Sequence, residues 1–138
     1  MVLEKTKRLD LKIDLNIDHN KKISFDYPRE PVDLLKLEEN SMNTVKGFLN
    51  GELVCHISLT NKRKYLEISY GCEAIFQKNG YMYELLEFFL QYFFNNTNEN
   101  EIYALINNNI ASRNLLLKSN FELYQNDEHG EWFIYKRK

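Results

Sequence analysis

The chain of 138 residues, 43% apolar and 14% aromatic, has the length and composition of one globular domain and lacks the charge signature of disorder. Its 18 basic and 20 acidic residues are scattered and give a net charge of -2, so we expect neither nucleic acid nor a membrane as a partner. No apolar run has the length of a signal peptide or a membrane helix, and we therefore expect a cytoplasmic protein.

Two strands and a short helical stretch are predicted before position 44. Apolar and polar residues alternate over 9–17 and again over 23–27, around the turn-like residues 18–21, which predicts two strands that a hairpin could join. Pro28 and Pro31 then interrupt the chain, and 32–40 indicates one or two turns of helix.

Three strand-like runs follow, at 44–49, 52–59 and 65–72. Asn50-Gly51 joins the first two runs and suits the positive φ angles of a two-residue hairpin turn. The polar residues 61–63 precede the third run. This pattern predicts a three-stranded antiparallel meander.

A helix is predicted from Gly80, because apolar residues recur there at helical spacing while polar residues occupy the other side. The apolar positions are Met82, Leu85, Leu86, Phe89, Leu90 and Phe93. A second ridge, which fits either a deeply packed helix or a dimer contact, consists of Tyr81, Phe88 and Tyr92.

The last third of the chain predicts a strand over 102–106 and a helix over 110–118. The asparagines 107–109 supply caps for that helix, and Asn120 ends it. A final hairpin of 121–125 and 132–136 follows. Strands and helices in this order predict an α+β domain without internal repeats or linkers.

The cysteines and histidines show no metal-ligand spacing. Cys55 and Cys72 lie in apolar stretches, which predicts two free buried thiols. His19 and His129 lie in expected turns, and His56 stands alone in a strand. We therefore expect no metal.

The segment 70–82 combines the end of a strand, a loop and the start of a helix. Unpaired backbone N–H groups at such a junction, with the positive end of the helix dipole behind them, suit a pyrophosphate, and Lys78 would add a charge. The pattern Gln-x-x-Gly-x-Met is weak by itself, because an ordinary strand-to-helix turn is the more common explanation of such a short motif.

This segment resembles the acetyl-CoA loop of the GNAT N-acetyltransferases, in which Gln or Arg, two residues, Gly and one residue precede Gly or Ala. Gln77 and Gly80 match, whereas Met82 departs from the pattern. Within that superfamily the RimJ/RimL branch is the most similar, since its loop continues into a Glu at the position of Glu84 and its preceding strand carries a sequence like 67–70.

A second signature of that branch, a strand ending in Asn-x-x-Ser at the start of a helix, resembles the sequence from Asn109 to Ser112. It continues to Asn120-Phe121, where the family has Gly-Phe. The two signatures together cover about 44–136.

The resemblance implies a GNAT fold, an α+β architecture with a mixed central sheet and helices packed on it. We expect one GNAT-like domain over 1–138, with a divergent N-terminal region at 1–40 in place of two helices and an acetyl-CoA-binding core at 44–136. Acetyl-CoA is the implied co-substrate. The residues implied to bind its pantetheine arm and pyrophosphate are Tyr70, Gly71, Cys72, Gln77, Lys78, Asn79, Gly80, Tyr81, Met82 and Asn109.

The implied reaction is direct attack of a primary amine on the thioester. Glu67 is the candidate for proton removal, although it could equally be a solvent-facing strand carboxylate. Ser112 and Tyr70 are candidates for contact with the leaving thiolate, and helix capping is the alternative role of Ser112. Many members of the superfamily carry a tyrosine that acts as general acid, and Leu116 occupies that position here.

The acceptor implied by the resemblance is a protein N-terminus or a small amine. Because the N-terminal region is short, the acceptor site could be open, completed by a second subunit in a homodimer, or lost. The alternative function is a catalytically silent domain of the same fold that binds acyl-CoA or another protein, as the departures at Met82 and Leu116 suggest.

Overall fold

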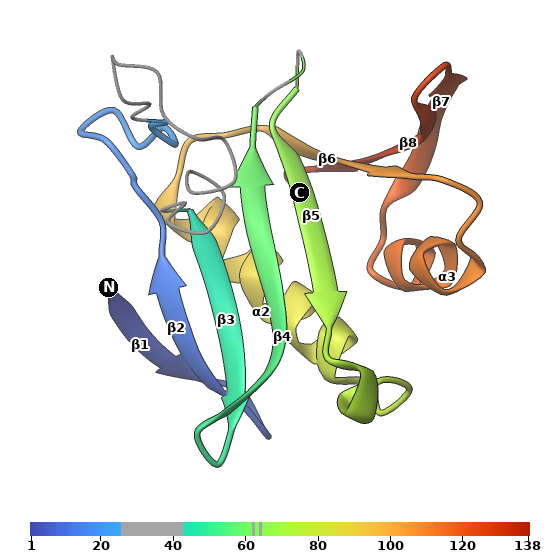
Figure 1. Ribbon diagram of the computed structural model, residues 1–138. Helices are drawn as coiled ribbons and strands as arrows, with labels where there is room; N and C mark the ends of the chain where they lie inside the picture. Colours follow the sequence, from blue (N-terminus) through green and yellow to red (C-terminus); the bar gives the residue numbers. More distant parts are fainter. Residues whose placement is uncertain (26–42, 62, 64) are drawn as a thin grey trace, which may run out of the picture.

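The computed structural model describes residues 1–25, 43–61, 63 and 65–138, and its main feature is an eight-stranded mixed sheet (Figure 1). In spatial order the strands are β1 (Val2–Lys5), β2 (Asp10–Asp14), β3 (Thr44–Leu49), β4 (Glu52–Thr60), β5 (Glu67–Cys72), β6 (Glu101–Ile106), β8 (Gly130–Lys136) and β7 (Glu122–Asp127). The helices are α2 (Tyr81–Asn96), α3 (Ile110–Lys118) and a short 3₁₀ helix, η1 (Ala74–Phe76).

The N-terminal hairpin differs from the sequence prediction. The strand expected over 9–17 is present as β2, but it pairs with β1 on one side and β3 on the other. Both edges of β2 are therefore occupied, and in the described residues the expected hairpin is present only at its turn. There an antiparallel bridge joins Ile17 and Ile23, and the Ser24 N–H donates to the Asn16 carbonyl at 2.8 Å. The helical turns expected over 32–40 lie outside the described residues.

The predicted meander of β3, β4 and β5 is confirmed, with Asn50 and Gly51 at positive φ angles in the first turn. Alternation along β4 directs Cys55, Ile57 and Leu59 into the core. The intervening side chains of β4, with their cross-strand partners on β3 and β5, occupy the opposite side of the sheet, which we call the polar face. It carries Lys46, His56, Ser58, Thr60, Glu67, Ser69 and the bare backbone of Gly71.

Helix α2 begins after Gly80, as predicted, and lies against the core side of β4 and β5 (Figure 1). Its fully buried side chains are Leu85, Leu86, Phe89, Leu90 and Phe93. The second ridge also packs against the core cluster, and so does Met82. The ridge is thus half-buried by packing within one chain.

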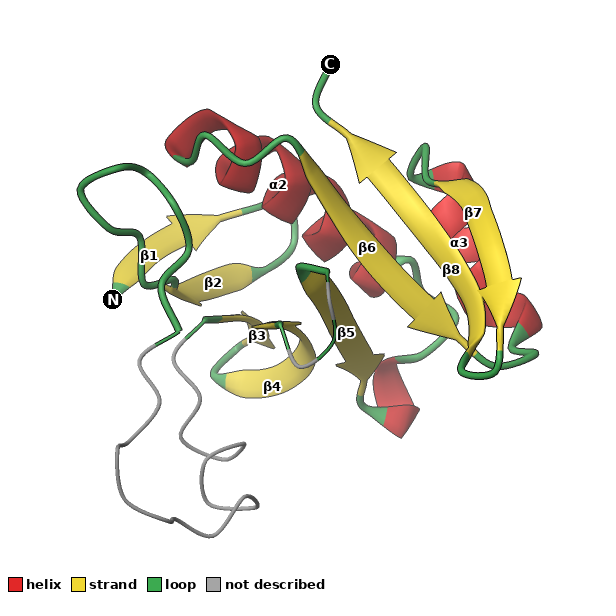
Figure 2. Ribbon diagram, turned by 90° about the horizontal axis from the view of Figure 1, so that it is seen from above, coloured by secondary structure: helices red, strands yellow, loops and turns green. Residues whose placement is uncertain are grey.

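The C-terminal elements also follow the sequence prediction. Strand β6 runs parallel to β5 and antiparallel to β8, and β7 and β8 form the final hairpin. The Asn109 side chain caps α3 by accepting a hydrogen bond from the Ser112 N–H, at 3.0 Å, and Asn120 adopts a φ of 69° after the helix. Figure 2 shows β6, β8 and β7 grouped together with α3 beside them.

Two arginines from the two ends of the chain hold the two ends of α2. At its start, Glu84 accepts hydrogen bonds from Arg8 Nε at 2.7 Å and from the Arg8 N–H at 2.9 Å, and a further one from the Thr6 hydroxyl. At its end, Arg137 donates to the carbonyls of Phe94 and Thr97, both at 2.7 Å. Helix α2 is therefore fastened both to the β1–β2 turn and to the segment after β8.

Glu84 makes the first of these contacts sensitive to pH. Partial burial acts to raise the pKa of Glu84, but the hydrogen bonds from Thr6 and Arg8 outweigh it and hold the pKa below the ordinary value of 4.5. A carboxyl whose pKa is lowered by folding stabilises the fold above its unfolded pKa, and that contribution disappears as the pH falls through the folded pKa.

We expect Glu84→Gln to lower the free energy of unfolding by about 1–2 kcal/mol at pH 7. The difference from the wild type should shrink once the pH falls below 4.5, and urea unfolding at a series of pH values measures it. The control is Glu87→Gln on the same helix, since Glu87 makes no hydrogen bond or ion pair in the described part of the chain. A difference of the same size at pH 3 and pH 7 would contradict the assignment.

Candidate functional site

The parallel strands β5 and β6 pair only at their beginnings. Glu67 lies opposite Tyr103 and Ile68 opposite Ala104, and no further pair joins the two strands in the part of the chain described. Beyond Ile68, β5 remains paired with β4 to its end, and β6 remains paired with β8 (Figures 1 and 2). The edge of β5 over 69–72 therefore pairs with no other strand in the described part of the chain, and its backbone groups other than the Cys72 carbonyl are open to a ligand that mimics a strand.

The loop that leaves the open end of β5 is fastened by its own amide side chains. Gln77 Nε2 donates to the Cys72 carbonyl at 3.1 Å, and Asn79 Nδ2 donates to the carbonyls of Phe76 and Gln77, at 3.3 and 3.1 Å. Lys78 and Gly80 have φ angles of 65° and 79°, in the left-handed region. Glycine is the residue that adopts this conformation without strain, which explains its position immediately before α2.

The start of α2 offers a cluster of unused donors. Among the described residues, the backbone N–H groups of 78–83 donate to no protein acceptor, whereas the Glu84 N–H already bonds to the Gly80 carbonyl, at 3.1 Å. The helix dipole adds partial positive charge at this end, and the Lys78 side chain is exposed beside it. The arrangement can bind an anion such as a phosphate group.

Arg8 also belongs to this site, and sequence reasoning missed it. Arg8 Nη1 donates to the Asn79 carbonyl at 2.9 Å, and the guanidinium carbon lies 4.2 Å from the centre of the Tyr81 ring. Nothing local in the sequence links the basic residues before position 9 to a loop about 70 residues later, so they indicated only a contribution to net charge. The guanidinium both orders the loop and adds positive charge to it.

Met82 does not occupy the space in front of these amides. Its side chain is half-buried and packs against the hydrophobic core, as the Tyr81 side chain does. A flexible thioether side chain can take that direction without strain. The departure from the family pattern at this position therefore leaves the loop surface open.

Tyr70 and Ser112 face each other across the opening between β5 and β6. The Tyr70 hydroxyl is buried and has no hydrogen bond of good geometry within the described residues. Burial raises the pKa of Tyr70, and the nearby Ser112 hydroxyl partly counteracts this. A buried hydroxyl without a partner is rare in folded proteins, and this one is available to a ligand.

The first turn of α3 uses Asn109 and Ser112 in its cap, through the Asn109 side-chain oxygen and the Ser112 N–H. Within the described residues, the amide nitrogen of Asn109 donates to no acceptor, and the Ser112 hydroxyl lies near that of Tyr70. Leu116 is completely buried in the core, so α3 brings no phenol to the opening at that position.

Glu67 lies apart from Tyr70 and Ser112, at the closed end of the β5–β6 pair. Its side chain is buried, 5% exposed, and Oε2 accepts a hydrogen bond from Arg63 Nη1 at 3.0 Å. At about 3.3 Å of rise per residue, roughly 10 Å of strand separates Glu67 from Tyr70. The structure thus brings two of the three candidate catalytic residues together and leaves the third at a distance.

The two cysteines are free, but only Cys55 is fully buried, while Cys72 is half-buried at the end of β5. The expectation of two buried thiols is therefore corrected for Cys72. Burial raises the pKa of Cys55 to about 12 and also raises that of Cys72. Both thiols are protonated at neutral pH, which excludes them as ready nucleophiles.

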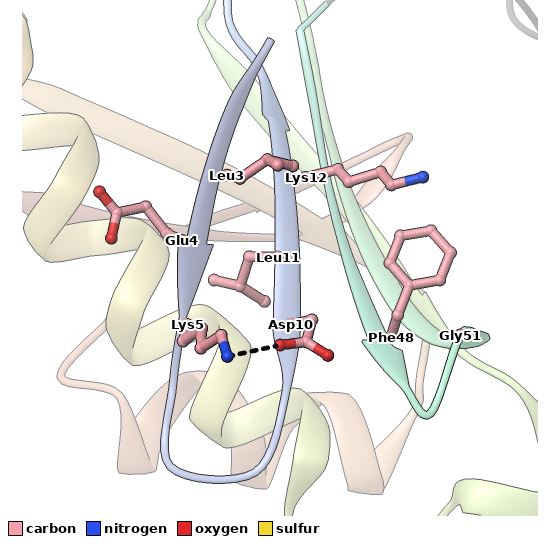
Figure 3. Close-up of a pocket in the computed structure, with 8 residues that line it drawn as sticks. All are labelled: Leu3, Glu4, Lys5, Asp10, Leu11, Lys12, Phe48 and Gly51. Carbon is pink, nitrogen blue, oxygen red and sulfur yellow. Dashed lines mark ion pairs between the residues drawn. The ribbon is translucent and has the colours of Figure 1, made fainter.

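A surface pocket also lies elsewhere on the sheet. A pocket of about 560 Å³ is formed at the β1 edge of the sheet, between β1, β2 and the turn after β3 (Figure 3). Lys5 and Asp10 form an ion pair across it at 3.8 Å, and Lys12 lies over the Phe48 ring. It is four strands from the β5–β6 opening.

In the described ranges, no three His, Cys, Asp or Glu side chains lie close enough together to hold a metal ion. None of the helices described there is long and apolar enough to cross a membrane.

No family model matches the sequence, and no curated protein matches it significantly. Solved structures with the same fold include an acetyltransferase of Agrobacterium tumefaciens, with a TM-score of 0.71 at 15% identity over 99% of this chain and 95% of that one. A ribosomal-protein-S5-alanine acetyltransferase of Vibrio fischeri has a TM-score of 0.66 at 12% identity, over 99% and 97% of the two chains.

The N-acetyltransferase PseH of Campylobacter jejuni, solved in complex with acetyl coenzyme A, has a TM-score of 0.59 at 18% identity, covering 76% of this chain and 75% of that one. Other similar structures belong to acetyltransferases of the GNAT family. The chain therefore has the GNAT fold, as the sequence analysis expected. At these identities the likeness establishes the fold alone.

The unpartnered hydroxyl of Tyr70 gives a test of the site without any ligand. We expect Tyr70→Phe to change the free energy of unfolding by less than about 0.5 kcal/mol, because the variant loses no hydrogen bond. The matched control is Tyr103→Phe, which removes the bond from the Tyr103 hydroxyl to Glu101 Oε1, 3.0 Å long, and should cost about 1–2 kcal/mol. Urea unfolding of both variants compares them, and an equal loss in both would mean that Tyr70 has a protein partner.

Proposed function

We propose that this protein is a GNAT-type N-acetyltransferase that transfers the acetyl group of acetyl-CoA to a primary amine by direct attack. The observation that carries the proposal is the early end of the β5–β6 pairing, which leaves the edge of 69–72 free beside the donors at the start of α2. A strand edge that can bind an amide-containing arm, next to a site for phosphates, has the two parts that coenzyme A requires.

In this proposal the pantetheine arm pairs with the backbone of 70–72, and Asn109 hydrogen-bonds to the arm through its free amide nitrogen. The pyrophosphate is bound by the backbone N–H groups of the loop from Gln77 to Met82, with Lys78 and Arg8 adding charge. Support comes from the unused donors of that loop and from the acetyl coenzyme A bound by the C. jejuni protein of the same fold.

The Tyr70 hydroxyl and Ser112 would then meet the sulfur of the thioester. As the amine nitrogen bonds to the acetyl carbon, the carbon–sulfur bond breaks, and the thiolate requires a proton or a hydrogen-bond donor. Tyr70 supplies one, because its raised pKa keeps the hydroxyl protonated at neutral pH and the hydroxyl lacks any other good partner.

Glu67 remains the acidic candidate for proton removal, acting through water because of its distance from Tyr70. For the acceptor we propose a protein N-terminus or a small amine, as in the RimJ/RimL branch. The protein would be cytoplasmic and consist of one GNAT-like domain, with an acceptor site that a homodimer completes. The match to the V. fischeri acetyltransferase over nearly its whole length supports this choice.

Binding of acetyl-CoA tests the cofactor site. At 100 times its dissociation constant the cofactor should stabilise the protein by about 2.7 kcal/mol. Arg8→Ala should raise the dissociation constant about tenfold, because it removes a charge and the hydrogen bond to the Asn79 carbonyl. The control is Lys7→Ala at the neighbouring exposed position, which should leave the dissociation constant unchanged. Isothermal titration calorimetry measures both, and the absence of binding by the wild type would reject the proposal.

Release of free thiol, measured with a panel of amines and N-terminal peptides, tests catalysis. Tyr70→Phe should lower kcat at least tenfold while acetyl-CoA still binds, and Glu67→Gln should lower kcat less, as expected for a group acting through water.

Binding without any thiol release would favour the second candidate, a catalytically silent acyl-CoA-binding domain. The burial of Leu116, at the position where the family has its general acid, also suggests this candidate. Unchanged turnover in Glu67→Gln would remove that residue's role.

A further inference from the structure

His56 lies in the middle of β4, on the polar face of the sheet. Its cross-strand partners are Lys46 on β3 and Gly71 on β5. Gly71 lies within the stretch of β5 that does not pair with β6, between Tyr70 and Cys72. His56 is the titratable residue of the polar face whose side chain lies next to this edge of β5.

Gly71 removes the side chain that would separate the imidazole from the free edge. A Cβ atom built on Gly71 would lie 2.9 Å from His56 Cε1, which means that the ring occupies the space over the glycine backbone. Within the described residues, neither ring nitrogen of His56 forms a hydrogen bond or an ion pair. The imidazole is half-buried, positioned by packing, and free to interact with a ligand at the edge.

The surroundings favour the neutral imidazole. Partial burial lowers the pKa of His56 below its ordinary value, and Lys46 from β3 lowers it further, while Glu73 from the loop after β5 acts in the opposite sense. Cys72, on the other side of β5, is protonated and adds no charge. At neutral pH the ring is therefore ready to accept a proton.

The polar face also links His56 to Glu67. Ser58 lies opposite Ser69, and Thr60 lies opposite Glu67, so hydroxyl groups follow one another along the two strands from the imidazole to the carboxylate. Alternate residues of a strand are about 6.6 Å apart, a gap that one water molecule bridges.

We propose that the His56 imidazole accepts the proton of the acceptor ammonium at the free edge of β5, and that the hydroxyl row carries this proton towards Glu67. The proposal rests on the acetyltransferase function proposed above. The protons balance: the ammonium gives its first proton to His56, and the nitrogen that has bonded to the acetyl carbon gives its second to the departing thiolate through Tyr70. Because Tyr70 and Gly71 alternate along β5, the base and the acid act from opposite faces of the strand.

The first test is the pH dependence of kcat/KM in the full chain. His56→Gln should lower kcat/KM about 100-fold at pH 7 with acetyl-CoA binding unchanged, and its activity should keep rising towards the pKa of the free amine. The control is His129→Gln, in an exposed turn where His129 pairs with Glu128 at 3.5 Å. His56→Ala with added imidazole should regain activity, which a purely structural role would not allow.

A second test needs no turnover. The chain has three histidines, so the imidazole NMR signals can be assigned by substitution. The signal that His56→Gln removes should titrate below pH 6.5, and it should shift when coenzyme A is added, while the other two remain unaffected. No shift on saturation with coenzyme A would overturn the placement of His56 at the edge.

The outcomes separate the two proposals. Turnover by the wild type together with His56→Gln activity within twofold of it would overturn the role of His56 and leave the acetyltransferase function intact. Absence of turnover with every amine tested would overturn both. A loss of activity that added imidazole does not restore in His56→Ala would also count against a proton-accepting role.

Discussion

The candidate site depends on one constraint, the end of parallel pairing between β5 and β6 after two residue pairs. Each strand keeps its other neighbour throughout: β5 follows β4, and β6 follows β8 to the last residue. The sheet therefore divides at this point into two half-sheets, β1–β5 and β6–β8, and the strand pairing within each half continues. A parallel pair cannot end without leaving backbone groups unpaired, and these groups have a favourable free energy of binding to a ligand with strand-like amides.

The elements around the opening have different tasks. The loop before α2 is preorganised by its own side chains, with Gln77 and Asn79 turned inward to backbone carbonyls, so that its N–H groups remain directed outward without an ordering cost on binding. Arg113 on α3 forms an ion pair with Glu131 on β8, which holds the first turn of α3 beside the opening. Rigid elements thus carry the groups that the proposed reaction requires.

Local features of the sequence predicted local structure well. The asparagine turn at Asn50, the cap at Asn109 and the helix end at Asn120 each rest on interactions within a few residues, and all three are present. Strand β1 was missed because all of its side chains are exposed, so no apolar alternation indicates it. The tie between Arg8 and Glu84 spans 76 residues and leaves no trace in either local pattern.

The candidate site likewise contains features that depend on local sequence and features that depend on contacts between distant residues. The loop from Gln77 to Gly80 could be located from its motif, because its function depends on backbone conformation that sequence determines directly. The approach of Tyr70 to Ser112 and that of His56 to Gly71 depend on strand register and on the point at which β5 and β6 separate. A role for a single histidine in a strand cannot be predicted until its cross-strand neighbour is known to lack a side chain.

The two arginines at the ends of α2 give the helix a mechanical role. Arg8 belongs to the half-sheet that contains β5, and Arg137 follows β8 in the other half, so the helix acts as a strut of fixed length between them. A change in the separation of the two half-sheets would therefore strain the hydrogen bonds of Arg8 or of Arg137. The width of the opening thus depends in part on contacts at the two ends of α2, outside the strands that form it.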